Sequence, residues 1–383
     1  MNINFILGGG TATRTTAGGE VRGDKLAIRG KFRGIAATTD GAVYLFTQER
    51  QGMVMWYREA SGAAKRIPIS EMGNQTAEQA AVAPDGSIYL ATGDLWKVSP
   101  GGSATKIVDT DCKKDTSTAD STKLSDFCTG QVTGVTVTKD GSVYFGDEIT
   151  LGHRGSFVHK ISGDAVELIA GRSSKDGESL KRSNPAVQNG IAPAAGTKAK
   201  AVLVPDIWNS GWLAADEHGL YWRTGPGVVH INADGTLSPL VGAKAPDKVT
   251  EAGAPFEKMG RALDAEIGES ALDQLRGDLA VTSERGEVFY TDAQKTYSPP
   301  FSSEYRWGGD KSASQKDFIE NLVGGKAIYR VAAGEVSPTA VGVQGIAASG
   351  TSLYIAAEST SGTKESAEDQ LTAVLQVELP EEK

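Results

Sequence analysis

The chain has 383 residues, of which 23% are charged and 39% are hydrophobic, a composition typical of a globular protein rather than a disordered one. Its 39 basic and 48 acidic side chains give a net charge of −9. This acidic balance argues against a nucleic-acid binder or an anionic-membrane binder, because both need a basic face. The sequence contains no apolar run of about 18 residues, so it predicts no membrane-spanning helix.

The first segment, Met1–Leu7, lacks the basic start and the long apolar core of a secretory signal. Its alternation of polar and apolar residues is typical of a β-strand. We therefore expect either a cytoplasmic protein or an exported one whose leader was removed.

A strand–turn–strand unit recurs along the chain. Its clearest copies are 34–45, 81–90 and 134–145, and looser copies cover 211–222, 279–290 and 345–355. In the clear copies an Asp-Gly pair lies between β-branched and aromatic residues. Asp-Gly favours a two-residue hairpin turn, because glycine adopts positive φ without steric cost.

Two further predicted strands follow each of the first five hairpins, and one follows the last. The turn glycines Gly41 and Gly86 are 45 residues apart (86 − 41), which suits a four-stranded propeller blade of about 40–50 residues. The predicted blades cover 34–69, 79–108, 132–170, 211–241, 278–341 and 343–379, with 2–7 as the missing strand of the last. The sequence thus predicts an all-β, six-bladed β-propeller in one domain, closed by its N-terminal strand.

These units resemble NHL repeats and, more distantly, lactonase-like and strictosidine-synthase-like propellers. Leu168-Ile169-Ala170-Gly171, followed by 189–195, is similar to the Gly- and Ala-rich segment between NHL blades, and so is 252–255 leading into 271–277. The resemblance covers nearly the whole chain. It departs from the family pattern at the end of the second strand. Asp-Thr-Gly-Asn is common there in NHL repeats, and only Thr291-Asp292 of this chain is similar to it. It implies a fold, and because such propellers include sensors, scaffolds, lyases and hydrolases, function must come from a site.

Long connections gather on one face of the predicted ring. With the strands of each blade named A to D from the axis outward, every A–B turn and complete C–D turn is short. The extra length lies in D–A and B–C connections, which share what we call the loop-rich face; the other is the short-turn face. Binding residues usually lie on loops over a rigid scaffold, so we expect function on the loop-rich face. The alternative is that the D–A segments only pack between blades.

The B–C connection of the fifth blade is rich in aromatic residues. The predicted ligand contacts in and near it are Trp208, Tyr297, Phe301, Tyr305, Arg306 and Trp307. Aromatic and arginine side chains on loops suit a protein interface or sugar stacking, unless they fold back and are buried. Helical spacing over 260–275 predicts one short helix packed on the propeller.

Several carboxylates follow the B strands. The set that would converge at the mouth of the ring is Glu49, Asp147, Asp292 and Glu358. Lactonase-like propellers hold a divalent metal in a comparable mouth. Converging oxygens could bind calcium, and a metal-bound water could attack an ester. The alternative is that these side chains form hydrogen bonds with neighbouring turns.

The two cysteines, Cys112 and Cys128, lie in one polar D–A segment. A disulfide between them would stabilise that loop and favour an oxidising compartment; two free thiols are the alternative. His159 aligns with Tyr57, Trp96 and other packing positions of the repeat, so it is predicted to be a core residue.

The sequence lacks the Gly-x-Ser-x-Gly, Ser-x-x-Lys and His-Glu-x-x-His signatures of hydrolases and metalloproteases. We therefore expect a non-catalytic binding propeller, monomeric on its own and extracytoplasmic, without a cofactor, that recognises a protein or glycan. One alternative is a calcium-dependent, lactonase-like hydrolase or lyase. Another is a structural or targeting subunit of a secreted assembly.

Overall fold

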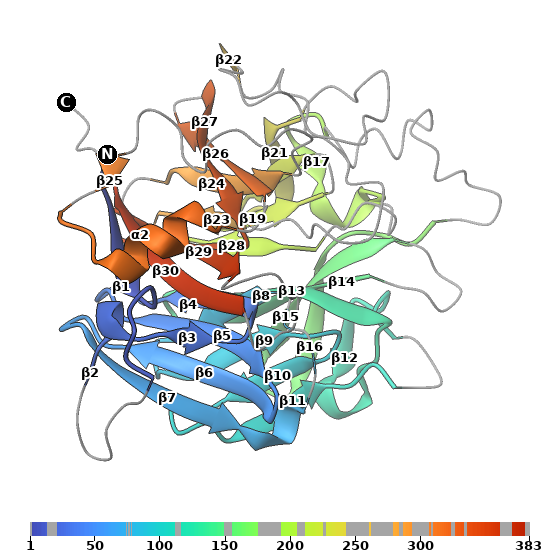
Figure 1. The fold of residues 1–383 in the computed structure, drawn as a ribbon. Helices are drawn as coiled ribbons and strands as arrows, with labels where there is room; N and C mark the ends of the chain where they lie inside the picture. The colour runs from blue at the N-terminus through green and yellow to red at the C-terminus, as the bar shows by residue number, and fades with distance from the viewer. Residues whose placement is uncertain are drawn as a thin grey trace.

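The computed structural model describes most of the strands that the repeats predict. The described residues are 2–13, 21–73, 75, 77, 79–111, 116–148, 155–174, 193–204, 211–224, 227–242, 260–261, 279–282, 286–292, 306–307, 309–322, 326–332, 335–360 and 370–379. They form six sheets, whose innermost strands contact one another in a closed cycle, β4–β8–β13–β18–β23–β28 (Figure 1). The predicted propeller fold is confirmed.

Each blade contributes four antiparallel strands in the order A to D. Blade 1 has β4 (Lys31–Ala37), β5 (Val43–Glu49), β6 (Gly52–Arg58) and β7 (Ala63–Ile69). Blade 2 has β8 (Gln79–Val82), β9 (Ile88–Ala91), β10 (Leu95–Val98) and β11 (Ala104–Val108). Blade 3 has β13 (Gln131–Val137), β14 (Val143–Glu148), β15 (Ser156–Ser162) and β16 (Ala165–Ala170).

The second half of the ring repeats this order. Blade 4 has β18 (Leu213–Ala215), β19 (Leu220–Arg223), β20 (Val228–Ile231) and β21 (Thr236–Val241). Blade 5 has β23 (Leu279–Val281), β24 (Val288–Asp292), β26 (Lys326–Ala332) and β27 (Glu335–Val343). Blade 6 has β28 (Gly345–Ser349), β29 (Ser352–Thr360), β30 (Gln370–Glu378) and β1 (Asn2–Leu7).

The N-terminal strand closes the ring, as predicted. β1 pairs antiparallel with β30, with Asn2 opposite Glu378 and Phe5 opposite Leu375. Ile3, Leu7 and Leu375 are fully buried, so this closure buries apolar surface as well as pairing the backbone.

The A–B turns of the clear repeats differ from the predicted two-residue type. In blade 1 the Thr38 N–H donates to the Ala42 carbonyl, and the Gly41 N–H donates to the Thr38 carbonyl at 3.0 Å. Gly41 has φ of 86°, which only glycine adopts without strain. The turn is therefore a three-residue loop that ends in a left-handed glycine. Asp40 accepts hydrogen bonds from the Thr38 hydroxyl and the Ala42 N–H, which fixes the wider loop.

Five blades carry a fifth, outermost strand that the sequence did not predict. These strands are β2 (Val21–Arg22), β12 (Ser121–Lys123), β17 (Thr197–Lys198), β22 (Gly260–Arg261) and β25 (Arg306–Trp307). The first four pair antiparallel with the D strands β7, β16, β21 and β27, whereas β25 pairs parallel with β1. Blade 2 has four strands in the described part of the chain. A further short strand, β3 (Ile28–Arg29), pairs with β30 of blade 6.

Short 3₁₀ helices link three outer strands to the ring: η1 (Gly23–Lys25), η3 (Leu124–Asp126) and η4 (Ala199–Ala201). The first N–H of each donates to a carbonyl of the C–D turn beside it, at 2.7–2.9 Å. The chain then turns inward, where Leu26, Phe127 and Val202 are buried. The described D–A segments thus pack on and between blades, the alternative that the sequence left open. The connection before blade 2 is shorter and contains η2 (Ser70–Met72).

One short helix, α2 (Ala313–Glu320), is described, and it lies in the B–C insertion of blade 5. The Ser312 hydroxyl accepts from the Gln315 N–H at its N-terminus, while the Phe318 ring packs edge-on against Phe5 at 5.6 Å. The predicted helix over 260–275 is wrong at its start, because Gly260–Arg261 is the outer strand β22. Residues 262–275 lie outside the described residues.

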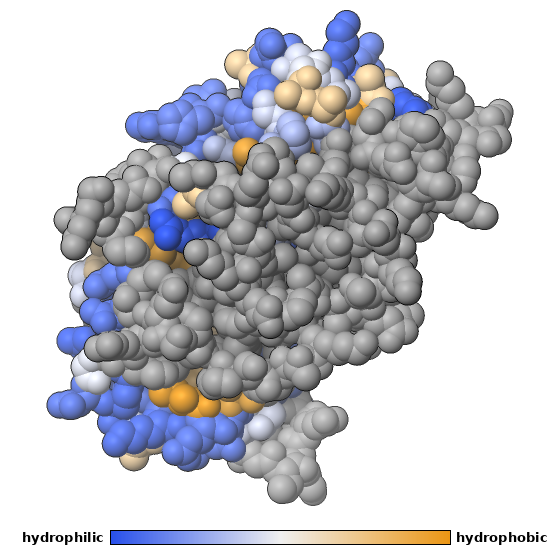
Figure 2. Space-filling view, turned by 90° about the horizontal axis from the view of Figure 1, so that it is seen from above, coloured by the Kyte–Doolittle hydropathy of each residue, from blue (hydrophilic) through white to orange (hydrophobic). Residues whose placement is uncertain are grey.

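Within the described ranges, no helix is long and apolar enough to cross a membrane. Figure 2 shows mainly hydrophilic described residues at the visible edges of one face, with a narrow band of hydrophobic ones between them.

Candidate functional site

One side chain of the described residues, Gln79 of β8, joins inner strands of several blades at the axis of the propeller. Its Nε2 donates to the Leu213 carbonyl at 2.6 Å, and its Oε1 accepts from the N–H groups of Leu213 and Val135 at 3.1 and 3.0 Å. The amide therefore bridges the inner strands of blades 2, 3 and 4, and its Nε2 also lies 3.5 Å from the Leu279 carbonyl of blade 5. Gln79, Leu213 and Leu279 are the first residues of their strands, whereas Val135 lies in the middle of β13, so the bridge is on the loop-rich side of the short-turn face. Since Gln79 is 7% exposed, the bridge is an interior structural element.

A cavity of about 1120 Å³ begins at Gln79 and extends along the inner strands to the A–B turns. Small apolar residues such as Ala36, Ala81 and Ala214 line its walls. At its far end lie the turn residues Asp40, Lys139 and Glu217. The axial cavity therefore reaches the short-turn face, whereas the site predicted from the sequence lies on the loop-rich face.

Asp147, one of the predicted metal ligands, ends β14 inside blade 3. It is fully buried, its Oδ2 lies 3.2 Å from His159 Nε2, and it accepts a short hydrogen bond from the Thr129 hydroxyl. The His159 ring stacks on Phe145 with 5.1 Å between centroids and lies edge-on to Phe127. A carboxylate enclosed in this way is oriented toward its own blade.

A pair of residues at the equivalent positions of blade 1 shows that the contact between His159 and Asp147 is part of the repeat. His159 is opposite Phe145 in its sheet, as Trp56 is opposite Leu45, and Trp56 Nε1 donates to the Thr47 hydroxyl at 3.2 Å. His159 and Asp147 thus occupy the positions of the Trp56 ring and the Thr47 hydroxyl of blade 1, with an N–O contact of 3.2 Å between them. The prediction that His159 is a packing residue agrees with this geometry, although its counterpart in blade 1 is Trp56 rather than Tyr57.

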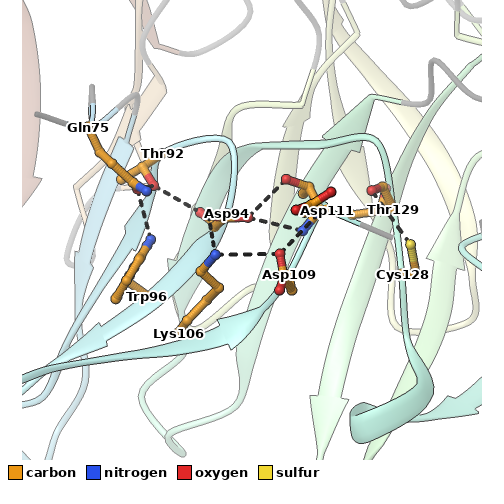
Figure 3. A network of polar contacts seen from close by, with 10 residues as sticks. Gln75, Thr92, Asp94, Trp96, Lys106, Asp109, Asp111, Cys128 and Thr129 are labelled. Atoms are coloured by element: carbon orange, nitrogen blue, oxygen red, sulfur yellow. Dashed lines mark hydrogen bonds and ion pairs between the residues drawn. The ribbon is translucent and has the colours of Figure 1, made fainter. Parts of the chain in front are cut away.

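Glu49 also has a partner within its blade. Its carboxylate forms a bidentate contact with the Arg66 guanidinium, with N–O distances of 2.6 and 3.2 Å. Asp94 of blade 2 is held similarly by Lys106 at 3.0 Å and by the Thr110 hydroxyl at 2.9 Å (Figure 3). In both blades a basic side chain of the D strand neutralises an acid that follows the B strand.

Glu358, in β29, is 4% exposed and accepts a hydrogen bond from the Phe32 N–H of blade 1 at 2.5 Å. Burial raises the pKa of this carboxyl, against the opposing effect of the Phe32 N–H. Glu358 therefore links blades 6 and 1 at the closure of the ring.

In the described part of the chain, no three acidic, histidine or cysteine side chains are grouped to hold a metal ion. Glu49, Asp147 and Glu358 each contact a different partner, and the side chain of Asp292 lies outside the described residues. The calcium set stays a prediction.

The predicted ligand contacts fall mostly outside the described residues: Trp208, Tyr297, Phe301 and Tyr305. The backbone of Arg306 and Trp307 is described. These residues form β25, which extends the outer edge of blade 6, with Asn2 opposite Arg306 and Ile3 opposite Trp307. The end of the aromatic loop is therefore anchored to a blade.

Of the two cysteines of the predicted disulfide, only Cys128 lies within the described residues. Cys128 is buried, and none of the described cysteines is free, but Cys112 lies outside the described residues. The pairing stays a prediction.

Sequence reasoning missed Gln79, although the repeats contain a signal for it. Gln79 aligns with Gly34, Gly134 and Gly345, since each is opposite the residue two places after the B-strand tyrosine. At Gly134 an added Cβ would lie 2.0 Å from the Gly211 carbonyl oxygen. A long polar side chain at a position that is glycine in three other blades indicates a special role at the axis.

Neither a protein-family model nor the sequence of a curated protein matches the chain. Solved propellers resemble it in fold. A virginiamycin B lyase from Staphylococcus aureus has 11% identity and a TM-score of 0.42, over 91% of this chain and 95% of that one. A gluconolactonase from Xanthomonas campestris has 9% identity and a TM-score of 0.45, over 92% and 88%. The calcium-binding protein regucalcin from Agrobacterium tumefaciens has 9% identity and a TM-score of 0.44, over 92% and 93%. At these identities the resemblance concerns fold alone.

Proposed function

We propose that this protein is a non-catalytic binding propeller that engages a protein or glycan through its loop-rich face. The observation that carries the proposal is the pairing of the rim carboxylates. Glu49 with Arg66, Asp147 with His159 and Glu358 with the Phe32 N–H each complete a contact within or between blades. These groups stabilise the scaffold, so recognition falls to the connections that the scaffold carries.

The closed axis supports the same function. Gln79 joins three inner strands at the loop-rich end, so that this end is a braced floor under the connections. A rigid floor under loops lowers the entropy that is lost when the loops contact a partner. The aromatic set from Tyr297 to Trp307, with Trp208, is the proposed contact surface, and it suits a protein surface or sugar rings.

The test uses variants on both faces of the full-length chain. Tyr305→Ala and Trp307→Ala alter the proposed surface, whereas Lys139→Ala and Glu217→Ala alter the exposed short-turn face and serve as controls. Binding is measured on a glycan array and against cross-linked protein partners, and each hit is titrated with the four purified variants. We expect at least a tenfold loss of affinity for the first pair, an unchanged melting temperature, and wild-type affinity for the controls.

A loss confined to Lys139→Ala or Glu217→Ala would move the site to the axial cavity and overturn the proposal. A large fall in the melting temperature of the Tyr305 and Trp307 variants would show that these rings are structural. Either result ends the assignment of the aromatic loop as the contact surface.

Elemental analysis of protein purified without chelator tests the rival calcium-dependent enzyme. The binding function predicts no bound calcium and the same melting temperature with and without EDTA. One calcium per chain and a large EDTA-induced fall in the melting temperature would instead favour a calcium site formed by the predicted carboxylates, and would justify screens with esters and lactones.

A further inference from the structure

The outer edge of blade 2 differs from that of every other described blade. Short outer strands pair with the D strands of blades 1, 3, 4, 5 and 6. In blades 1, 3, 4 and 5 the paired residues include the first two after the C–D turn, and in blade 6 they are the first two of β1. In blade 2 these two positions are Ser103 and Ala104, and in the described part of the chain no strand pairs with them.

Burial reflects this difference. The second of the two positions is fully buried in the covered blades, as Ala64, Val166, Leu237 and Ile3 show with exposures of 0–1%. Its blade 2 counterpart, Ala104, is only partly buried, and Ser103, Thr105 and Lys106 around it are exposed. An open D strand presents a row of backbone donors and acceptors, which is a template for another strand.

Blade 3 shows which backbone groups point outward. The Leu168 N–H of β16 donates to the Asp120 carbonyl at 3.0 Å, and the Leu124 N–H donates to the Asp164 carbonyl at 2.7 Å. Leu168 is opposite His159, as Lys106 is opposite Trp96, and a register shift follows at the same place in both blades. The outward groups of blade 2 are therefore the Lys106 N–H and the Gly102 carbonyl, with Ala104 between them.

We propose that the outer edge of blade 2, Gly102–Lys106, is a docking site for an extended peptide segment of a partner protein, which adds antiparallel to β11 as the missing fifth strand. Strand addition of this kind is a known mode of peptide recognition. The site is independent of the loop-rich surface proposed above.

The chain's own outer strands define the chemistry of the segment. Each antiparallel outer strand ends in a basic residue, namely Arg22, Lys123, Lys198 and Arg261. The residue before it is Val21, Thr122, Thr197 or Gly260, and it lies opposite the buried D-strand position. A partner segment with a small or β-branched residue followed by Lys or Arg would reproduce this pairing. A basic segment also suits a chain with a net charge of −9.

A second copy of this chain fits the edge less well. Two β11 strands that paired antiparallel about Ala104 would set each Lys106 opposite Gly102 of the other copy, and a charged lysine on an edge strand opposes such self-pairing. The Lys106 ammonium is held at the edge by Asp94 at 3.0 Å and Asp109 at 3.4 Å (Figure 3).

The experiment combines amide exchange with a peptide titration on the full chain. The probe is a synthetic peptide with the sequence of residues 119–125, which contains the blade 3 outer strand; its Lys123→Glu version is the peptide control. In the free protein we expect a protected Leu168 amide and a rapidly exchanging Lys106 amide. The probe should slow exchange at Lys106 and shift the amide signals of Ser103–Lys106, and the Lys123→Glu peptide should bind at least threefold more weakly.

Two protein variants separate the role of the Lys106 backbone N–H from that of its side chain. Lys106→Leu copies Leu168 of blade 3 and keeps the N–H that binds the Asp120 carbonyl there, whereas Lys106→Pro removes it. Pro239 and Pro338 occupy this position in blades 4 and 5, where the outer strand has two residues instead of the three of blade 3 that the probe contains. Both variants lose the lysine contact with Asp94. They differ from each other in whether residue 106 has a backbone N–H that points out of the sheet edge. We expect the probe to bind Lys106→Pro at least tenfold more weakly than Lys106→Leu.

Four results would overturn the proposal. Protection of the Lys106 amide in the free monomer would show that the chain covers its own edge. A dimer in sedimentation that Lys106→Pro abolishes and Lys106→Leu retains would show that a second copy occupies it. Equal binding of the probe to both variants would place the peptide elsewhere. Absence of binding at millimolar peptide would show that the edge is not a docking site.

Discussion

The two ends of the propeller axis are built in opposite ways. At the loop-rich end, Gln79 joins three inner strands, and the rim acids Glu49, Asp147 and Glu358 are each paired. At the short-turn end a cavity of about 1120 Å³ reaches the turns, where Asp40, Lys139 and Glu217 are exposed. The acids at the loop-rich end are thus held by other protein groups, whereas charged side chains at the short-turn end are exposed to solvent.

The comparison shows that acidic side chains near a propeller mouth do not form a metal site merely because they lie there. The buried ones need partners, because an unpaired buried charge is costly. At the closed end the repeats supply those partners at equivalent positions, as Arg66 and Lys106 show. Substitutions at the two ends should therefore differ in their effect on stability.

The largest effect is expected from His159→Phe at the closed end. It leaves the Asp147 carboxylate buried without the imidazole 3.2 Å away, which should lower the free energy of unfolding by about 3 kcal/mol. Trp56→Phe in blade 1 is the matched control, since it removes a neutral hydrogen bond and should cost about 1 kcal/mol. Urea denaturation of both variants measures these losses. Equal losses would contradict the expectation that a buried carboxylate without its partner costs more than a lost neutral hydrogen bond.

Gln79→Leu should give the next largest effect. It leaves the backbone groups of Leu213 and Val135 without the side-chain amide, and water from the cavity replaces those bonds only in part. We expect a loss of about 2 kcal/mol in the free energy of unfolding. Gln79→Asn, which is one methylene too short to span the axis, should be similarly destabilised. Melting temperatures equal to wild type would show that Gln79 does not brace the ring.

Glu358→Gln should have a smaller effect of opposite sign. Burial raises the pKa of Glu358 in the folded protein, so folding favours its protonated form. The contribution to stability is fully present below the ordinary glutamate pKa and is lost as the pH rises through the raised value. The glutamine variant keeps an acceptor for the Phe32 N–H, and it should melt higher than wild type at pH 8 and equally at pH 4. A variant that melts lower at pH 8 would mean that the charge itself stabilises the ring closure.

At the open end, Lys139→Ala and Glu217→Ala should change the free energy of unfolding by less than about 0.5 kcal/mol, because both side chains are exposed to solvent. The same denaturation series measures them. A loss as large as that of Gln79→Leu would remove the distinction between the two ends.

The repeat predicted the fold because its signals are local and redundant. Tyr44, Tyr89 and Tyr144 mark the same B-strand position in three blades, and the structure places each opposite the next-to-last residue of its A strand. The N-terminal strand carries a local signal too, because its ending Leu7-Gly8 is similar to Ala170-Gly171 at the end of the blade 3 D strand. Patterns of this kind specify strand order and register without any long-range information.

Features that depend on contacts with residues outside the strand itself could not be predicted in this way. The outer strands are two or three residues long, so they contain no period, and only the basic residue at their ends recurs. The partners of Asp147 and Glu358 come from other strands, so sequence alone showed acids at a mouth and not their pairing. The Asp-Gly turn length was missed because the Thr38 N–H pairs with the Ala42 carbonyl, which widens the loop by one residue.

The closure of the ring has a mechanical consequence. In blade 6 the first described residue of β1, Asn2, lies opposite Glu378 near the end of β30. A force that pulls these two ends apart loads the hydrogen bonds of the β1–β30 ladder one after another, as in opening a zipper, and not all at once. Blade 6 would therefore be the first to yield under tension, and its opening would leave the other blades with an unclosed ring.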